Sequence, residues 1–298
     1  MNSVPVHCLL GVQVNALSQS ELLQIMRLAV DQRERIVIAN HNLNSVRLYH
    51  RDEMMRAFYS AAHYTHIDGM SLVILGRALG LPLRRDHRVT YVDWVDPIMR
   101  LACEADWRVF YLGSKEGVTC EGARVLRERH PGLKIHTHHG YFDTTPGSDE
   151  NERVLQEIRN YAPQVLFVGM GMPRQEKWIL QNLLRLSANV ILPCGACIDY
   201  IAGAIPTPPR WMGRIGLEWL YRLATEPRRL SRRYLVEPWP VLGRFVREWL
   251  KQVVTRKAED RHHNRSRADG ASAGASQCGK DSESAGEQLD MTVSTAGH

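Results

Sequence analysis

The chain lacks several features, and each absence excludes a class of protein. Its 298 residues contain no run of about 18 consecutive apolar residues, so we expect no membrane-spanning helix. The first residues, MNSVPVHCLLGVQVNAL, have neither a basic start nor a small-residue cleavage site, so we expect no signal peptide. The six cysteines follow no regular spacing, which favours a reducing cytoplasm over a secreted disulfide framework.

Two motifs that often accompany nucleotide chemistry are also missing. Asp-x-Asp occurs nowhere, although many nucleotide-sugar transferases hold a divalent metal through paired carboxylates. We therefore expect no metal, and a leaving diphosphate would be neutralised by arginines and backbone amides. The segment Gly169-Met-Gly-Met-Pro-Arg-Gln-Glu176 has Arg174 where a full GxGxxG has its third glycine, so a Rossmann dinucleotide site is only weakly indicated.

Short apolar runs alternate with helix-like stretches along most of the chain. This alternation predicts an α/β fold, with a parallel sheet covered by helices on both faces and ligands beyond the carboxyl ends of the strands. The predicted strands are 7–14, 35–39, 64–67, 108–112, 134–137, 164–168 and 190–192. The predicted helices are 18–32, 42–62, 71–79, 92–105, 117–129, 151–161 and 175–186.

The composition changes after Gly203. We predict a core over residues 1–204, a helical appendage over 205–257 and a disordered tail over 258–298, where apolar residues nearly vanish. Within the appendage, helices are expected at about 210–225, 227–236 and 241–257.

The predicted appendage is strongly basic. Residues 207–257 hold twelve Lys and Arg against four Asp and Glu, a net charge of +8 (12 − 4). Such a segment indicates a polyanionic partner, namely nucleic acid, anionic lipid or pyrophosphate. The interleaved Trp, Leu and Tyr residues suit a surface that touches lipid.

Asp68 directly follows the predicted strand at 64–67 and precedes Gly69 and a predicted helix. A carboxylate there lies at the mouth of the sheet, where it can act as a general base. The alternative is a helix N-cap, a position that Asp favours. The position alone favours the cap.

Two other strands are followed by glycine-containing segments that open helices. Glycines let the backbone approach a phosphate or ribose, and a helix N-terminus favours anions. Plain turn chemistry is the alternative. The candidate contacts to a nucleotide or sugar are Gly113, Ser114, Gln175 and Glu176.

Two clusters can be interpreted as metal or redox sites. Cys194 and Cys197 form a CxxC pair, but one pair cannot complete a four-ligand zinc site, so we favour buried small residues. Of His136, His138 and His139, only His136 and His138 would share a face of a strand, so we favour a surface cluster.

Taken in order, several segments over about residues 5–240 resemble the WecG/TagA/CpsF glycosyltransferases, glycosyltransferase family 26. Most of these segments are loose individually, but their order and the close match of the last one carry the resemblance. They are Ile67-Asp-Gly-Met70, His87-Arg-Val-Thr90 with Asp93, Leu112-Gly-Ser-Lys115, Gly140-Tyr-Phe142, Gly169 to Glu176, Asp199-Tyr-Ile-Ala-Gly203, and Gly216-Leu-Glu-Trp-Leu-Tyr-Arg-Leu223 with Glu226-Pro-Arg-Arg229.

The resemblance implies a Rossmann-like α/β fold of the GT-E type with a C-terminal appendage. Members transfer a sugar from a nucleotide donor, typically UDP-linked, to a polyprenyl-diphosphate-linked saccharide, with inversion and without metal. They serve teichoic acid, enterobacterial common antigen, capsule and exopolysaccharide assembly. The implied enzyme is a hexosyltransferase for N-acetylmannosamine, mannosaminuronic acid or a related sugar, with a UDP-sugar as donor substrate and no cofactor.

Site residues carry over by motif. Asp68 becomes the general base in place of the capping interpretation, and Gln175 matches the active-site glutamine. Arg222, Arg229 and Arg232 fall where appendage arginines neutralise a diphosphate. The substrate-binding residues implied are Asn40, Arg88, Thr90, Asp93, Gly113, Ser114, Gly169, Gly171, Gln175, Glu176 and Asp199.

The sequence departs from the family pattern at three places. It reads Thr207-Pro-Pro209 where Arg-Ala-Pro is usual, Tyr91 where a glycine is usual, and Ile38 in the early Thr-x-Asn region. These changes leave the identity of the donor sugar open, but they do not affect the class of reaction that the resemblance implies.

The family implies a cytoplasmic protein at the inner face of the cell membrane, with an anionic membrane surface as partner and self-association as a further expectation. One rival is a nucleotide-dependent oxidoreductase, which needs an acidic residue about 20 residues beyond the glycines. Another is a nucleic-acid-binding module, which the leucine and tryptophan content of the appendage disfavours.

Overall fold

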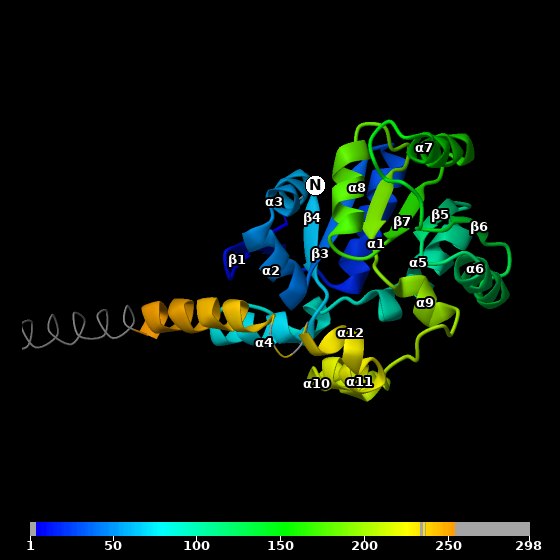
Figure 1. The fold of residues 1–298 in the computed structure, drawn as a ribbon. Coiled ribbons are helices and arrows are strands. Elements are labelled where there is room, and N and C mark those ends of the chain that lie inside the picture. The colour runs from blue at the N-terminus through cyan, green and yellow to red at the C-terminus, as the bar shows by residue number, and fades with distance from the viewer. Residues whose placement is uncertain (1–3, 233–234, 236, 254–298) are drawn as a thin grey trace, which may run out of the picture. The chain divides into compact units, whose positions relative to one another are not determined.

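The computed structural model describes residues 4–232, 235 and 237–253, apart from the side chains of Arg210, Arg214, Ile215 and Arg229 (Figure 1). The chain divides into two compact units, residues Met1–Phe245 and Val246–His298. The fold and the site described here belong to the first unit. The boundaries proposed at 204 and 257 stay predictions, and the tail predicted over 258–298 lies outside the described residues.

The centre of the first unit is a six-stranded sheet in the order β4-β3-β8-β7-β5-β6. All of its strand pairs are parallel, which confirms the predicted α/β class. The strands are β3 (Ile36–His41), β4 (Tyr64–Ile67), β5 (Arg108–Gly113), β6 (Lys134–His138), β7 (Val165–Gly169) and β8 (Val190–Pro193).

The predicted strand at 7–14 is wrong. The chain instead forms an antiparallel hairpin of β1 (Val6–Leu9) and β2 (Val12–Asn15), which lies outside the main sheet. Leu10 and Gly11 form its turn with φ angles of 55° and 76°. Positive φ at both central residues is typical of the tight turns that join antiparallel strands.

Helices cover both faces of the sheet because its strands bury side chains in both directions. Tyr111 and Phe167 pack on one face with α1, α5, α6 and α9, whereas Phe110 and Leu166 pack on the other with α3, α7 and α8. The bounds are α1 (Gln19–Asp31), α3 (Glu53–Ala61), α5 (Tyr91–Glu104), α6 (Val118–Arg129), α7 (Asp149–Tyr161), α8 (Arg174–Asn182) and α9 (Cys197–Ile201).

The predicted helix at 42–62 is two helices, α2 (Leu43–Arg51) and α3. Asp52 interrupts it with extended backbone, and its carboxylate caps α3 by accepting hydrogen bonds from the amides of Met54 (2.9 Å) and Met55 (3.4 Å). An aspartate that accepts from the next helix's free amides stabilises a break of this kind. Helix α4 (Met70–Ala78) follows β4.

The predicted helix at 210–225 is also two helices, α10 (Arg210–Ile215) and α11 (Glu218–Thr225). Gly216 ends α10 with a φ of 82°, a conformation that favours glycine. Within the predicted helix at 227–236 the structure gives α12 (Pro227–Ser231), and residues 233, 234 and 236 lie outside the described part of the chain. Residues 239–253 are helical. Val241, 1% exposed, packs in the cluster that contains the β1–β2 hairpin, α2 and α4.

Candidate active site

The carboxyl edge of the sheet has two halves. On one half, β3 leads into Asn42 and β4 leads into Asp68. On the other half, β5 ends at Gly113, and β7 and β8 lead into loops that contain Gly171 and Gly195. Because all six strands are parallel, these residues share the edge where α/β proteins bind ligands.

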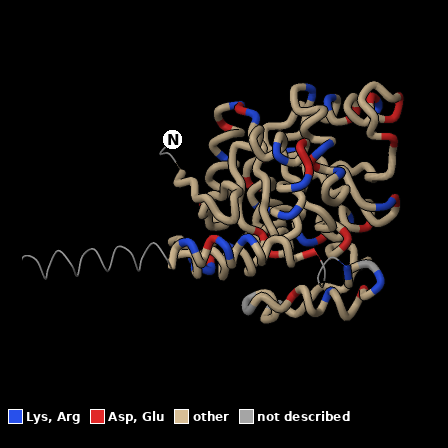
Figure 2. Tube along the Cα trace, turned by 60° about the vertical axis from the view of Figure 1, so that its left-hand side comes forward, with Lys and Arg blue, Asp and Glu red and all other residues tan. Residues whose placement is uncertain are grey.

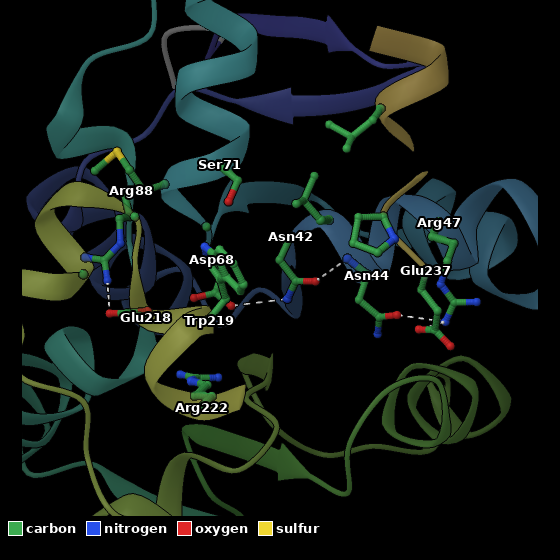
Figure 3. A pocket seen from close by; sticks show the side chains of 17 residues that line it. Asn42, Asn44, Arg47, Asp68, Ser71, Arg88, Glu218, Trp219, Arg222 and Glu237 are labelled. Carbon is green, nitrogen blue, oxygen red and sulfur yellow. Dashed lines mark hydrogen bonds and ion pairs between the residues drawn. The ribbon is translucent and has the colours of Figure 1, made fainter. Parts of the chain in front are cut away.

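A pocket of about 330 Å³ lies over the half that carries Asp68 (Figure 3). Side chains from α2, from the start of α4 and from α11 line it, so segments far apart in the chain meet there. The lining residues are Asn42, Leu43, Asn44, Arg47, Asp68, Gly69, Met70, Ser71, Arg88, Gly213, Gly216, Glu218, Trp219, Arg222, Glu237, Pro238 and Leu242.

The Asp68 carboxylate accepts a hydrogen bond from the side-chain amide of Asn42 at 3.4 Å. The residue that precedes α4 at the N-cap position is Gly69, without a side-chain cap, so the capping interpretation of Asp68 was wrong. Burial raises the pKa of Asp68, while the positive charges of Arg222 and Arg88 oppose that rise. A carboxyl group with a raised pKa that lines a pocket is suited to proton transfer.

Arg88 lies at one end of the pocket with its side chain 9% exposed. Its backbone pairs with that of Ile67 in an isolated parallel β-bridge. Its guanidinium forms ion pairs with Asp93 (3.4 Å) and with Glu218 of α11. The structure therefore brings the predicted residues Arg88 and Asp93 together. Thr90, 5% exposed, precedes α5 without a side-chain cap.

The three predicted arginines of the appendage lie differently. Arg222 lies beside Asp68 and Trp219 in the pocket (Figure 3). Its guanidinium stands over the Tyr200 ring, 5.1 Å from the ring centroid. Arg232 is exposed and is not a lining residue. The side chain of Arg229 lies outside what the structure describes.

On the other half of the edge, the loop after β5 packs tightly on β7. A Cβ on Gly113 would lie 2.6 Å from the Cα of Gly169, so only glycine allows this approach. Ser114 has a φ of 58°, and its hydroxyl donates to Asp199 at 2.8 Å. The predicted residues Gly113, Ser114, Gly169 and Asp199 are thus neighbours.

Gln175 is fully buried and joins two loops. Its side-chain oxygen accepts from the amides of Gly171 and Gly195, both at 3.1 Å, and its nitrogen donates to Glu176 at 2.8 Å. Much of its hydrogen-bonding capacity is therefore used within the protein. A direct contact between Gln175 and substrate stays a prediction.

Glu176, on α8, and Asn40, on β3, are buried polar residues. Glu176 is fully buried, and burial raises its pKa to about 7. Among the described residues, its Oε2 atom and the Oδ1 atom of Asn40 have no hydrogen-bond partner. The Asn40 amide nitrogen donates to the carbonyl of Pro193 at 3.2 Å, which ties β3 to β8.

The cysteine pair is buried, and two of the histidines lie beside a glutamate. Cys194 is buried beside the Tyr111 hydroxyl, and burial raises its pKa to about 12, which disfavours a reactive thiolate. His136 and His138 lie near Glu157, with nitrogen–oxygen distances of 2.6 and 4.0 Å. Within the described part of the chain, no three His, Cys, Asp or Glu side chains gather as a metal site requires.

Sequence reasoning missed several lining residues. Asn42 had a usable signal, since it follows a buried strand and caps a helix, as Asp68 was expected to do. Glu218 and Trp219 stand inside the segment 216–223, from which only Arg222 was predicted as a site residue. Arg47 and Glu237 belong to no motif.

The chain is similar in sequence to known proteins along much of its length. Among curated proteins, N-acetylglucosaminyldiphosphoundecaprenol N-acetyl-beta-D-mannosaminyltransferases of Staphylococcus aureus strains NCTC 8325, COL and MRSA252 are each 30% identical over 171 residues. The aligned part spans 57% of this chain and 65% of each relative. The profile described as the glycosyl transferase WecG/TagA/CpsF family matches residues 7–255, and the chain belongs to this family.

Proposed function

We propose that this protein transfers a sugar from a UDP-sugar to a hydroxyl group of a polyprenyl-diphosphate-linked saccharide. The observation that carries the proposal is the position of Asp68, a partly buried carboxyl group in a pocket that also holds Arg88 and Arg222. The pocket thus offers a base and positive charge within one cavity. The reaction inverts the anomeric configuration and uses no metal.

In the proposed step, Asp68 accepts the proton of the acceptor hydroxyl while that oxygen attacks the anomeric carbon of the donor. The bond from this carbon to the diphosphate breaks on the opposite side, and the electron pair leaves with UDP. Arg222 neutralises the charge that develops on the diphosphate, and Arg229 and Arg232 are proposed to assist. Charge stabilisation of this kind contributes on the order of 3 kcal/mol per well-placed donor.

The two halves of the sheet edge suit the two substrates. We place the nucleotide against Gly113, Ser114, Gly169, Gly171 and Asp199, where backbone amides and helix N-termini favour a diphosphate and a ribose. The acceptor saccharide enters the pocket on the other half, so that both substrates meet at Asp68. The remaining residues predicted to bind substrate are proposed to lie around this meeting point. They are Asn40, Thr90, Asp93, Gln175 and Glu176.

The proposed acceptor lies in a membrane, and the helices after residue 209 suit a peripheral position on it. Lys and Arg recur along these helices (Figure 2). Trp211, Leu235 and Trp239 are 59%, 54% and 68% exposed. Aromatic and basic side chains together favour an anionic lipid surface. Over the described residues, no helix combines the length and apolar character needed to span a bilayer. We place the protein at the inner, cytoplasmic face.

The named activity of the relatives guides the choice of substrates. Their acceptor is N-acetylglucosaminyldiphosphoundecaprenol and their transferred sugar is N-acetylmannosamine. A panel of UDP-sugars, including UDP-N-acetylmannosamine and UDP-mannosaminuronic acid, should be incubated with this acceptor while UDP release and the lipid product are measured. Acceptor-dependent release of UDP with one donor supports the proposal. Binding of NAD without binding of UDP would favour an oxidoreductase instead.

A further inference from the structure

The pocket continues from Asp68 to a second arginine, Arg47, at the end opposite Arg88 (Figure 3). Arg47 lies on α2 one turn after Asn44, and its Nη2 atom is 2.9 Å from the Asn44 side-chain oxygen. The same nitrogen lies 3.0 Å from a carboxylate oxygen of Glu237, which precedes the helix at 239–253. The Arg47 and Glu237 side chains are 15% and 23% exposed. A partly desolvated ion pair therefore closes this end of the pocket.

We propose that Arg47 binds the diphosphate of the lipid-linked acceptor, and that Glu237 occupies this anion site until the acceptor displaces it. The inference rests on the proposed function and assigns the lipid-bearing end of the same pocket. A carboxylate and a phosphate offer similar pairs of oxygens to the two-pronged donor of a guanidinium. Glu237 thus resembles the ligand that would replace it.

The chemistry of the acceptor requires two separate contacts. Its diphosphate is attached to the anomeric carbon of the first sugar, whereas the attacking hydroxyl belongs to another carbon. When that hydroxyl lies at Asp68, the diphosphate must therefore bind to a different part of the pocket. At the Arg88 end, Asp93 and Glu218 already place two carboxylates beside one guanidinium. At the Arg47 end, the ion pair to Glu237 is the contact that a diphosphate would replace.

The side chains around this end also suit a lipid. Leu43, Pro238 and Leu242 supply apolar lining. On either side of Glu237, Leu235 and Trp239 are more than half exposed. A polyprenyl chain that leaves the diphosphate at Arg47 would pass along these apolar groups. With the polyprenyl chain at the Arg47 end, Arg222, beside Asp68, contacts the leaving diphosphate of the donor.

The test compares two acceptors in steady-state kinetics. One is N-acetylglucosamine linked through a diphosphate to a polyprenyl chain, and the other carries the same chain without phosphate. Arg47→Gln should raise the KM for the diphosphate acceptor about tenfold or more, because a charge-assisted contact is lost, and should leave the KM for the phosphate-free acceptor nearly unchanged. Glu237→Gln should lower the KM for the diphosphate acceptor severalfold by removing the competing carboxylate.

The double variant Arg47→Gln/Glu237→Gln separates binding from folding. If Arg47 served only to neutralise Glu237, this variant would recover wild-type kinetics, and that result would overturn the inference. Arg51→Gln, at an exposed arginine of the same helix, is the matched control and should change neither KM.

The inference is also wrong if Arg47→Gln leaves the KM for the diphosphate acceptor unchanged, or raises both KM values equally, while the wild-type protein transfers sugar. Failure of the proposed function itself would look different, because no UDP-sugar would then be consumed by the wild-type protein.

Discussion

The side-chain amide of Asn42 donates to Oδ2 of Asp68 at 3.4 Å, while its side-chain oxygen accepts from the backbone amides of Asn44 and Ser45. Asn42 therefore caps α2 and orients the carboxylate at the same time. The two residues follow neighbouring parallel strands, β3 and β4, so the sheet itself holds them together. The proposed base is thus positioned by backbone pairing rather than by a loop alone.

Replacing Asp68 by Asn should remove transfer and keep the fold. Loss of a general base costs about a hundredfold or more in kcat. Burial disfavours the charged form of Asp68, so the neutral variant should have an equal or higher free energy of unfolding at pH 7. Steady-state UDP release and urea denaturation measure the two effects. Turnover close to that of the wild type would remove Asp68 from the mechanism.

Two substitutions of Asn42 should have distinguishable effects. Asn42→Ala loses the helix cap, at a cost of about 1 kcal/mol in stability, and lowers kcat because Asp68 loses its orienting donor. Asn42→Asp keeps a capping oxygen but places a second carboxylate beside Asp68, which raises the pKa of Asp68 further.

The measurement for Asn42 is the dependence of kcat on pH. Asn42→Asp should move the acidic limb of the profile to higher pH, whereas Asn42→Ala should mainly lower the plateau. Identical profiles for both variants would contradict an electrostatic link between residues 42 and 68.

The pH dependence of kcat should also change when the charge of Arg222 is removed. A base acts only when deprotonated, so activity rises with pH through the raised pKa of Asp68. Because the charge of Arg222 lowers that pKa, Arg222→Gln should move the acidic limb to higher pH and reduce kcat by about a hundredfold. Arg232→Gln, at an exposed arginine that does not line the pocket, should leave the position of the limb unchanged. Equal shifts in both variants would point to a general charge effect.

Glu176 should make stability depend on pH near neutrality. Its pKa is raised by burial from 4.5 to about 7, so the folded state binds the proton more tightly than the unfolded state does. This contribution is present in full below pH 4.5 and is lost as pH rises through 7, by about 3 kcal/mol in total. Glu176→Gln should abolish the dependence. The measurement is the difference in unfolding free energy between wild type and variant at pH 5 and pH 8, and a constant difference would disprove it.

The exposed tryptophans should contribute to membrane binding. Trp211→Ala/Trp239→Ala should weaken binding to vesicles that contain anionic lipid, by about tenfold or more, because two large aromatic side chains no longer enter the interface. Binding of the wild type should weaken as salt rises. Leu184→Ala removes a side chain that is 90% exposed on the sheet domain and is the matched control. Loss of binding in the control as well, or in neither variant, would place the membrane contact elsewhere.

Sequence patterns predicted the fold well where periodicity is local. The strand after residue 63 and the helices at α1, α5 and α6 agree with the structure within a residue or two. The patterns failed where a single residue interrupts an otherwise continuous run. Asp52 and Gly216 each divide one predicted helix, and the turn at Leu10 and Gly11 divides one predicted strand. These breaks depend on caps and positive φ angles, which apolar periodicity does not report.

The amino-acid sequence by itself determined the alternation of strands and helices along the chain, the position of Asp68 at a strand end and the basic, aromatic character of the last helices. Those properties follow from local spacing and composition. Only the tertiary structure decided that Arg88 meets Glu218, 130 residues away, that Arg47 meets Glu237, and that the Gln175 amide joins two loops. Such pairs depend on how helices pack after the chain has folded, because packing brings together side chains that no spacing in the sequence relates.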